Sequence, residues 1–292
     1  MISVVIPARN AADTLGEQLE ALAKQTRDRE CEVIVADNGS SDGTRQLAER
    51  HRDRLRNLVV IDAGHVRGPG AARNAGVAAS RGDRIAYCDA DDVVDEGWLD
   101  ALDHALEKNP LVGGPLVTHA LNEPWLIRTR PWLAHLEKGL APDGFLPWAS
   151  TANLGVRREL HDRIGGFDEK LRAQEDQDFC WRAAMAGSPI VFEPLAMVHY
   201  RLRARPWDIY RQARSYAQDY PALFKKYRPH GLSSAPVGLG AVVRLWGFPG
   251  LLLRDLPKAL GSREATALWA LRMGLRVGSF KGTLRHRYPL QL

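Results

Sequence analysis

The chain of 292 residues is 45% hydrophobic and 26% charged, which is the composition of a soluble globular protein of one or two domains. Its 26 Gly and 17 Pro follow no fixed period, which excludes collagen-like, solenoid and low-complexity chains. The charge is uneven: residues 201–292 carry 17 Lys and Arg against four acids, so this tail is at +13 and the first 200 residues are at −8. An acidic body predicts a bound cation such as a metal, and a basic tail predicts an anionic partner.

The N-terminus, MISVVIPARN, has an apolar strand pattern in place of the basic start and long apolar stretch of a signal peptide, so we expect a cytoplasmic protein. The cysteines Cys31, Cys88 and Cys180 form no CxxC pair. Their number and spacing argue against a disulfide framework or a cysteine-based zinc site and favour a reducing compartment.

The first half of the chain alternates short β-branched runs with helical patterns, which predicts an α/β fold with a mostly parallel central sheet. The expected strands are 3–8, 32–37, 58–63 and 84–89, and the expected helices are 12–25, 43–55, 71–80 and 96–109. The loops PARN, DNGSSDG, GHVRGPG and DADD follow the four strands. Ligands of open α/β sheets bind beyond the carboxyl ends of the strands, so the four loops predict one site.

Asp89, Asp91 and Asp92 follow the fourth strand, and three carboxylates this close repel one another unless a cation joins them. Mg²⁺ and Mn²⁺ prefer such oxygen ligands together with substrate phosphates. The alternative is a solvated acidic turn that precedes the helix at residue 96. The apolar strand in front and the polar loops around it favour the metal site.

Beyond residue 110 a Trp- and Pro-rich stretch at 120–150 leads to QEDQDFCWR, where a helix begins. Its first turn could stabilise carboxylates through the helix dipole alone, which is the simpler explanation for Asp178. A general base also needs an ionised carboxylate on a rigid element. We predict Asp176 as that base, with Glu175 as the alternative.

The strand-like runs PIVFEP and AMVHY are the last strands predicted, near residue 200. His199 in the second run is a candidate third metal ligand or a structural histidine. Arg9, Arg67 and Arg73 are candidates for pairing with phosphates. GPGAARNAG leads into a helix start suited to anions but matches neither the Walker pattern nor GxGxxG.

A helix is predicted for 206–228, and the basic tail follows. Its longest apolar tract, 235–253, is interrupted by Arg244 and Pro249, which argues against a membrane-spanning helix. Burial at an anionic lipid surface and packing on the protein's own body remain the two alternatives. Nucleic-acid binding is disfavoured because the tail has no recognised reading motif.

The motifs VVIPARNAADTL, EVIVADNGSSDGT, GPGAARNAG, YCDADD and GGFDE followed by QEDQDFCWR resemble, in order and spacing, the family 2 glycosyltransferases, which have the GT-A fold. The resemblance spans about residues 1–200. It implies a nucleotide-sugar donor, of which UDP is the commonest nucleotide in the family, a divalent metal, and inversion at the anomeric carbon.

Carried over by position, the resemblance implies a role for each matching residue. Asp91 would bind the metal directly, Asp89 would lie closer to the ribose or sugar, and Asp176 would be the catalytic base. His199 matches a metal- or diphosphate-binding histidine of some members. The donor-binding residues would be Pro7, Ala8, Arg9, Asp37, Gly70, Arg73, Asn74 and Asp89.

We therefore expect a GT-A domain over 1–205, with a nucleotide-sugar half at 1–110 and an acceptor half at 111–205, followed by a basic helical extension at 206–292. The expected function is a Mn²⁺- or Mg²⁺-dependent inverting transfer to a hydroxyl acceptor, either a lipid-linked or cell-envelope glycan precursor at the cytoplasmic membrane face or a soluble small molecule. A non-catalytic nucleotide-sugar-binding scaffold is the other alternative. A nucleotidyltransferase is disfavoured, because the first strand is not followed by a Gly-rich loop with a catalytic Arg and Lys.

Overall fold

The computed structural model describes residues 1–26, 30–141, 145–232 and 261–287. The chain divides into two compact units. The strand-rich unit contains Met1–Leu121, Trp132–Leu171 and Glu175–Arg201. The helical unit contains Asn122–Pro131, Arg172–Gln174 and the chain from Leu202 onward. Two short segments from the middle of the chain therefore group with the C-terminal residues.

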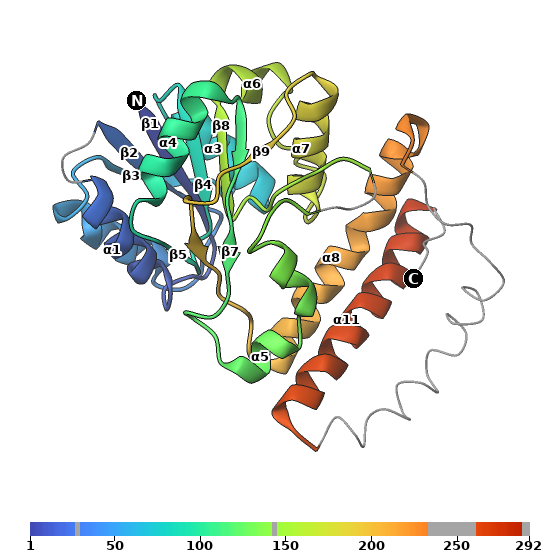
Figure 1. The fold of residues 1–292 in the computed structure, drawn as a ribbon. Helices are drawn as coiled ribbons and strands as arrows, with labels where there is room; N and C mark the ends of the chain where they lie inside the picture. The colour runs from blue at the N-terminus through green and yellow to red at the C-terminus, as the bar shows by residue number, and fades with distance from the viewer. Residues whose placement is uncertain (27–29, 142–144, 233–260, 288–292) are drawn as a thin grey trace. The chain divides into compact units, whose positions relative to one another are not determined.

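The strand-rich unit is built on a seven-stranded sheet with the order β3-β2-β1-β4-β8-β6-β9 (Figure 1). Neighbours among β1 to β4 are parallel, whereas β8 runs antiparallel to both β4 and β6. A second, three-stranded sheet has the order β5-β10-β7. The strands are β1 Ile2–Ala8, β2 Cys31–Asp37, β3 Leu58–Asp62, β4 Arg84–Cys88, β5 Val93–Val94, β6 Leu111–Gly113, β7 Leu116–Val117, β8 Asn153–Arg157, β9 Val191–Phe192 and β10 Val198–His199.

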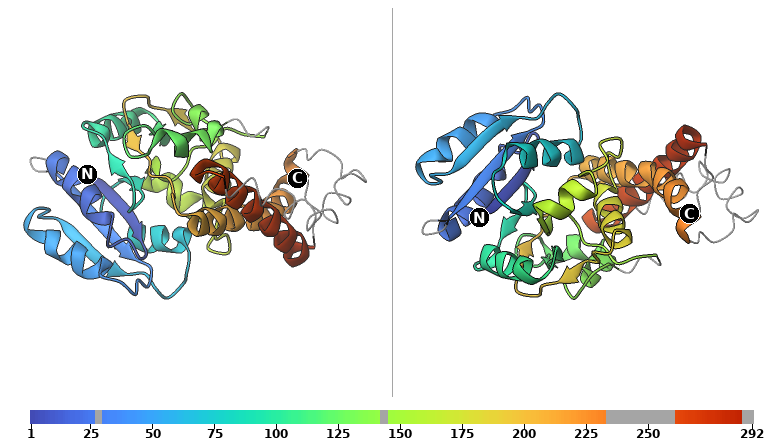
Figure 2. Two further views of the ribbon diagram at one scale, coloured as in Figure 1. Left: turned by 90° about the horizontal axis from the view of Figure 1, so that it is seen from below. Right: turned by 90° about the horizontal axis from the view of Figure 1, so that it is seen from above.

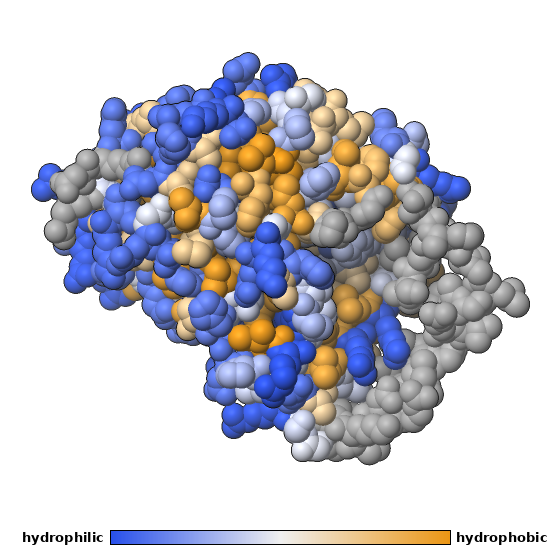
Figure 3. Space-filling view, viewed as in Figure 1, coloured by the Kyte–Doolittle hydropathy of each residue, from blue (hydrophilic) through white to orange (hydrophobic). Residues whose placement is uncertain are grey.

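Helices cover both faces of the central sheet, as Figures 1 and 2 show, and this explains why its strands are apolar almost throughout. On β1, Val4 and Ile6 belong to the core cluster that includes Leu15 and Leu19 of α1, whereas Val5 belongs to the cluster on the other face. The helices of this unit are α1 Leu15–Thr26, α2 Thr44–Arg50, η1 His51–Asp53, α3 Pro69–Ala79, α4 Trp98–Lys108, α6 Arg158–Arg163 and α7 Glu175–Met185, and η2 Pro131–His135 begins at its border. The surface over α1 is largely hydrophilic (Figure 3), as expected of a helix with one apolar face.

The four strands and four helices predicted for the first 110 residues are all present, with ends shifted by a few residues. The segment predicted as one helix, 43–55, instead contains the α-helix α2 followed by the short 3-10 helix η1. The short strands β5 to β8 were not predicted. Two or three residues carry too little periodicity to be recognised, and β8 is specified by its pairing with β4 and β6.

The helical unit consists mainly of α8, Pro206–Tyr227, and α11, Arg263–His286, with α5, Pro124–Arg128, and η3, Arg228–His230. The helix predicted for 206–228 is thus confirmed as α8. The helices α8 and α11 lie side by side and run in the same direction (Figures 1 and 2). Within the described residues, the helices are too short or too polar to cross a membrane. The predicted lipid-surface segment is 235–292, and its apolar tract 235–253 lies outside the described residues.

Three glycines of α11, spaced four residues apart, allow its backbone to approach α8 closely. A Cβ at Gly278 would lie 2.3 Å from the carbonyl oxygen of Arg214 and 2.9 Å from Cβ of Ala217. Gly274 and Gly282 meet the α8 carbonyls of Tyr210 and Gln218 at 2.4 Å in the same way. The contact therefore tolerates no side chain at these positions.

Gly278→Leu is expected to force α11 away from α8 and to destabilise the helical unit by about 1–3 kcal/mol, the usual cost of overpacking. Thermal unfolding and the rate of limited proteolysis within residues 202–292 measure the effect. The control is Lys281→Leu, which puts the same side chain at an exposed position of the same helix. Equal stability of the two variants would show that the close helix contact does not matter for folding.

Candidate active site at the carboxyl ends of the parallel strands

The first two predicted loops meet and hold each other at the carboxyl ends of β1 and β2. Asn10, with a φ of 50°, accepts a hydrogen bond from the amide of Ser41 through Oδ1 at 2.8 Å, and its own amide donates to Ser40 Oγ at 2.9 Å. Asp37 is buried and accepts from the amide of Ser40 at 3.1 Å. Pro7 and Ala8 end β1, and Arg9 next to them is exposed. The predicted nucleoside residues therefore share one edge of the sheet.

Asn38 ties the second loop to the third, and the sequence did not single it out. Its side-chain amide donates to the carbonyl oxygens of Ala63 and Val66 at 2.6 and 2.8 Å, and its Oδ1 accepts from the amide of Gly68 at 3.0 Å. Gly68 precedes α3. The position of Asn38 directly after β2 was the available signal, since polar side chains at strand ends organise the loops there.

The acidic turn after β4 brings three carboxylates together. One carboxylate oxygen from each of Asp89, Asp91 and Asp92 lies within 4.8 Å of the others. Oxygen donors at this separation suit a hard divalent cation, which would also relieve their mutual repulsion. Asp92 is fully buried, whereas Asp89 and Asp91 are partly exposed, so the turn presents two of its three carboxylates outward.

Helix α1 and Thr14, the residue that precedes it, support this turn from one side. Thr14 Oγ1 donates to the carbonyl oxygen of Ala90 at 3.0 Å, and Gln18 Nε2 donates to that of Asp89 at 3.3 Å. Gln18 Oε1 accepts from the amide of Val94 at 2.9 Å. The backbone of the turn is thus held by α1 and the residue that precedes it.

Arg201, which the sequence did not single out, holds the turn from the other side. Its amide donates to Asp92 Oδ1 at 2.7 Å, its Nε donates to the carbonyl oxygen of Asp91 at 2.8 Å, and its Nη2 donates to Glu17 Oε2 at 2.6 Å. Arg201 therefore joins the acidic turn to α1. No local pattern could reveal this role, because the contact spans 110 residues of sequence.

Arg201→Ala is expected to weaken Mn²⁺ binding about 10–100-fold, the usual cost of removing a group that orients metal ligands. Electron paramagnetic resonance of free Mn²⁺ measures the affinity without a substrate. Arg54→Ala is the matched control, since it removes an exposed arginine that pairs with Glu20 of the same helix. An unchanged Mn²⁺ affinity in a folded Arg201→Ala protein would contradict the expectation.

Arg73 of α3 connects the acidic turn to α7. Its side chain is only 3% exposed, and it donates through Nη2 to Asp89 Oδ1 and through Nη1 to Glu175 Oε1, both at 2.8 Å. Burial alone would lower the pKa of Arg73, but the two carboxylates raise it, so the guanidinium stays charged. Both of these amino groups are already engaged, which makes Arg73 a link between two predicted site segments.

Asp176 and Glu175 open α7 in different surroundings. Glu175 is buried against Arg73, whereas Asp176 is partly exposed. The partial removal of Asp176 from water and the negative charge of the adjacent Glu175 raise the pKa of Asp176 to about 7. A carboxyl group with a pKa near neutrality is well matched to proton transfer at physiological pH. Asp178 instead pairs with Arg182 at 2.8 Å within the same helix, in line with a structural role.

His199 is next to Val93 in the second sheet but is not part of the cluster of three carboxylates. Among the described residues, the group that could hold a metal consists of Asp89, Asp91 and Asp92, and His199 is not in it. Its Nε2 lies 2.9 Å from Asp95 Oδ1. The structure therefore gives Asp92, and not His199, as the third member of the cluster.

The remaining predicted residues lie around α3 or in the Trp-rich stretch. Asn74 holds the segment after α6, because its amide donates to the carbonyl oxygen of Phe167 at 2.9 Å and its Oδ1 accepts from the Phe167 amide. Gly70 is buried, and a Cβ there would approach Cβ of Phe167 to 3.1 Å, while Arg67 is exposed. Of the tryptophans, Trp148 packs against the core and Trp132 is about half exposed.

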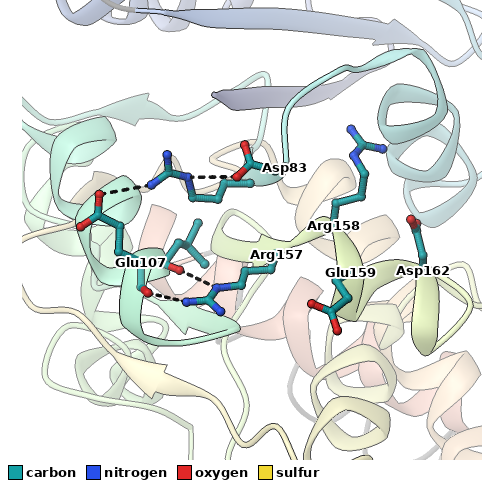
Figure 4. Close-up of a pocket in the computed structure, with 8 residues that line it drawn as sticks. Asp83, Glu107, Arg157, Arg158, Glu159 and Asp162 are labelled. Atoms are coloured by element: carbon teal, nitrogen blue, oxygen red, sulfur yellow. Dashed lines mark hydrogen bonds and ion pairs between the residues drawn. The ribbon is translucent and has the colours of Figure 1, made fainter.

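A pocket of about 690 Å³ lies where β4 begins and β8 ends, at the far end of this strand pair from the acidic turn (Figure 4). Its side chains are engaged with the protein itself: Arg84 pairs with Glu107, Arg157 donates to the carbonyl oxygens at the end of α4, and Arg158 donates to those after α3. None of the predicted site residues lines it. This pocket therefore has the features of a structural junction between helix ends.

The sheet, with an acidic turn after its fourth strand and a carboxylate at the start of a later helix, is the arrangement that the resemblance to GT-A glycosyltransferases implied. The model of glycosyl transferase family 2 matches residues 3–165, and the chain belongs to this family. The predicted family and fold class are thus confirmed.

Two curated relatives illustrate the likeness. The pre-mycofactocin glycosyltransferase of Mycobacterium tuberculosis is 31% identical over 217 residues, which are 70% of this chain and 44% of that protein. The succinoglycan biosynthesis protein ExoO of Rhizobium meliloti is 31% identical over 217 residues, 69% of this chain and 61% of that protein. The chain thus spans about half the length of such relatives.

Solved structures show the same fold at lower identity. The mannosyltransferase PcManGT from Pyrobaculum calidifontis, in complex with GDP-Man and Mn²⁺, has a TM-score of 0.64 and 21% identity, covering 98% of this chain and 86% of that one. Residues 1–349 of S. aureus TarS in complex with UDP-GlcNAc have a TM-score of 0.55 and 20% identity, covering 99% and 93%.

Proposed function

We propose that this chain is a metal-dependent inverting glycosyltransferase that moves a sugar from a nucleotide sugar to a hydroxyl acceptor. The observation that carries the proposal is the chain of contacts from the carboxylate cluster through Arg73 to α7, where Asp176 has a pKa of about 7. These contacts connect the acidic turn after β4 with the start of α7 within one unit, which supports a metal site and a base that act together. PcManGT with GDP-Man and Mn²⁺ and TarS with UDP-GlcNAc support a nucleotide-sugar donor and a divalent metal.

In this proposal each residue has a distinct task. Asp91 and Asp89 would hold Mn²⁺ or Mg²⁺, which, when bound, neutralises charge that develops on the leaving diphosphate. Pro7, Ala8, Arg9, Asp37, Gly70, Arg73 and Asn74 form the proposed donor site. Asp176 would take the proton from the acceptor hydroxyl as its oxygen attacks the anomeric carbon from the face opposite the leaving group. A single displacement of this kind inverts the anomeric configuration.

The donor can be identified by thermal unfolding of the protein with UDP, GDP, dTDP or CMP, each with Mn²⁺, with Mg²⁺ or with EDTA. A ligand that binds the folded state raises its melting temperature. We expect one nucleotide, UDP in the first instance, to stabilise the protein only with the metal present. If none does so in well-folded protein, the nucleotide-binding scaffold is excluded as well. The chain is then either a scaffold that keeps the fold without a donor site, or an enzyme whose site closes only with its acceptor present.

For the acceptor, we propose a lipid-linked or cell-envelope glycan precursor at the cytoplasmic membrane face. The helical unit supports this, because α11 exposes Phe280 and Leu284 beside Lys281 and Arg285, a mixture of apolar and cationic groups suited to an anionic lipid surface. Relatives such as ExoO are named for glycan synthesis. The pre-mycofactocin glycosyltransferase, by its name, supports the alternative of a small soluble acceptor.

Sedimentation with phosphatidylglycerol-containing vesicles at low salt tests the membrane part. The protein is expected to sediment with anionic vesicles and to be released by high salt. Phosphatidylcholine vesicles are the control. A protein that stays in solution with both would overturn the membrane part and leave the enzymatic proposal standing.

A further inference from the structure

The segment that leads into α7 is held by a buried carboxylate of the C-terminal helix α8. Asp219 is only 3% exposed, and its Oδ2 accepts hydrogen bonds from the amides of Arg172 and Ala173 at 2.8 and 3.1 Å. The side-chain amide of Gln174 donates to the carbonyl oxygen of Tyr216, one turn earlier on the same helix, at 3.3 Å. Residues 172–174 accordingly group with the helical unit.

The backbone changes direction immediately after these contacts. Gln174 has a φ of 66°, in the left-handed region that a glutamine adopts only at an energetic cost. The next residue, Glu175, begins α7, and Asp176 follows it. A strained residue persists only where its surroundings hold it. Here Asp219 holds the two residues before Gln174, and Tyr216 holds Gln174 itself.

We infer that Asp219 is a positioning residue for the catalytic base: it fixes residues 172–174 and thereby the start of the helix that carries Asp176. This inference rests on the proposed function of Asp176. A misplacement of a reacting group by about 1 Å can cost 10²-fold in rate, so the anchoring of this turn matters for the chemistry. The helical unit then contributes to turnover as well as to any membrane contact.

A purely structural role for Asp219 makes a different prediction. The buried amide of Ala173 needs an acceptor in any case, and losing it costs about 1–3 kcal/mol of stability, while the partly buried bond from the Arg172 amide adds less. Such a loss lowers the melting temperature but leaves the turnover number of the folded molecules unchanged. A positioning role lowers the turnover number while donor binding, which depends on the strand-end loops, stays the same.

The test compares Asp219→Ala, Asp219→Asn and the control Asp208→Ala, which removes another aspartate of the same helix. Nucleotide release from UDP-glucose, UDP-GlcNAc and GDP-mannose with Mn²⁺ gives kcat and KM for whichever donor is accepted. Hydrogen exchange of the peptide 170–176 reports the turn without any substrate. Measurements are made below the melting temperature of each variant.

Asp219→Ala is expected to lower kcat about 10–100-fold with KM for the donor within about twofold, and to accelerate exchange of the Arg172 and Ala173 amides. Asp219→Asn keeps an oxygen acceptor and is expected to retain kcat within about threefold. Asp208→Ala is expected to behave as the wild type. If Asp219→Ala does not fold, Asp219→Asn can still overturn the inference, since slow exchange and retained kcat are both required of it.

A folded Asp219→Ala protein with wild-type kcat, or with slow exchange at 172 and 173, overturns the inference. Failure of the proposed function gives a different result: the wild type releases no nucleotide, or Asp176→Asn is as active as the wild type. The two failures are therefore distinguishable.

Discussion

Asp176→Asn is expected to lower turnover by about 10²–10⁴-fold, the usual contribution of a general base, while the affinity for the nucleotide with Mn²⁺ stays within about twofold. Asparagine has nearly the same shape as aspartate but cannot accept the proton of the acceptor hydroxyl. Steady-state nucleotide release and nucleotide-induced thermal shifts measure the two quantities. Glu159→Gln, which changes an exposed carboxylate of α6, is the control.

The raised pKa of Asp176 adds a pH dependence to this prediction. A base must be ionised to act, so kcat/KM of the wild type is expected to rise with pH and to reach half its plateau at about pH 7. If turnover is equally high at pH 5, or if Asp176→Asn retains it, Asp176 is not the base. Retained turnover in Asp176→Asn would favour Glu175, which pairs with Arg73, as the base.

The same carboxyl group affects stability with the opposite sign to an ordinary aspartate. Its pKa is about 7 in the folded protein, above the ordinary aspartate value of 3.8, so the folded state keeps the proton over a range in which the unfolded state has lost it. Stability therefore falls as pH rises from about 4 to about 7. Asp176→Asn is expected to raise the melting temperature at pH 8 by about 2–6 °C and to leave it nearly unchanged at pH 4.

Asp91→Asn is expected to weaken nucleotide binding in the presence of Mn²⁺ at least about 100-fold, to the level that the wild type shows with EDTA. The substitution removes one charge of the cluster and leaves a weaker oxygen donor in its place. Calorimetric titration of nucleotide into protein, with and without metal, gives both affinities.

Asp95→Asn is the matched control, because Asp95 lies four residues further along the chain and faces His199. It is expected to leave metal affinity within about twofold. If Asp95→Asn and His199→Ala weaken binding as much as Asp91→Asn, the histidine belongs to the metal site as the family resemblance implied. If Asp91→Asn has no effect, the carboxylate cluster is not the metal site.

Much of the strand-rich unit was predictable because the relevant signals are local. A strand covered on both faces must be apolar along its length, and β1 to β4 are. Polar loops after parallel strands must meet at one edge. Asp37 is the last residue of β2 and Asp91 lies in the loop after β4, so both are at the same end of the sheet. The short strands β5 to β8 escaped prediction, because they exist through pairing with partners distant in sequence.

The amino-acid sequence by itself thus determined the α/β class, the edge of the sheet that carries the polar loops, and the carboxylates that gather there, since periodicity and strand ends are properties of short segments. Only the tertiary structure decided which side chains hold those carboxylates in place. Arg201 reaches Asp91 across 110 residues, Arg73 reaches Glu175 across 102, and Asp219 reaches Arg172 across 47. Such contacts depend on how distant segments pack, and packing is a property of the whole chain rather than of any segment.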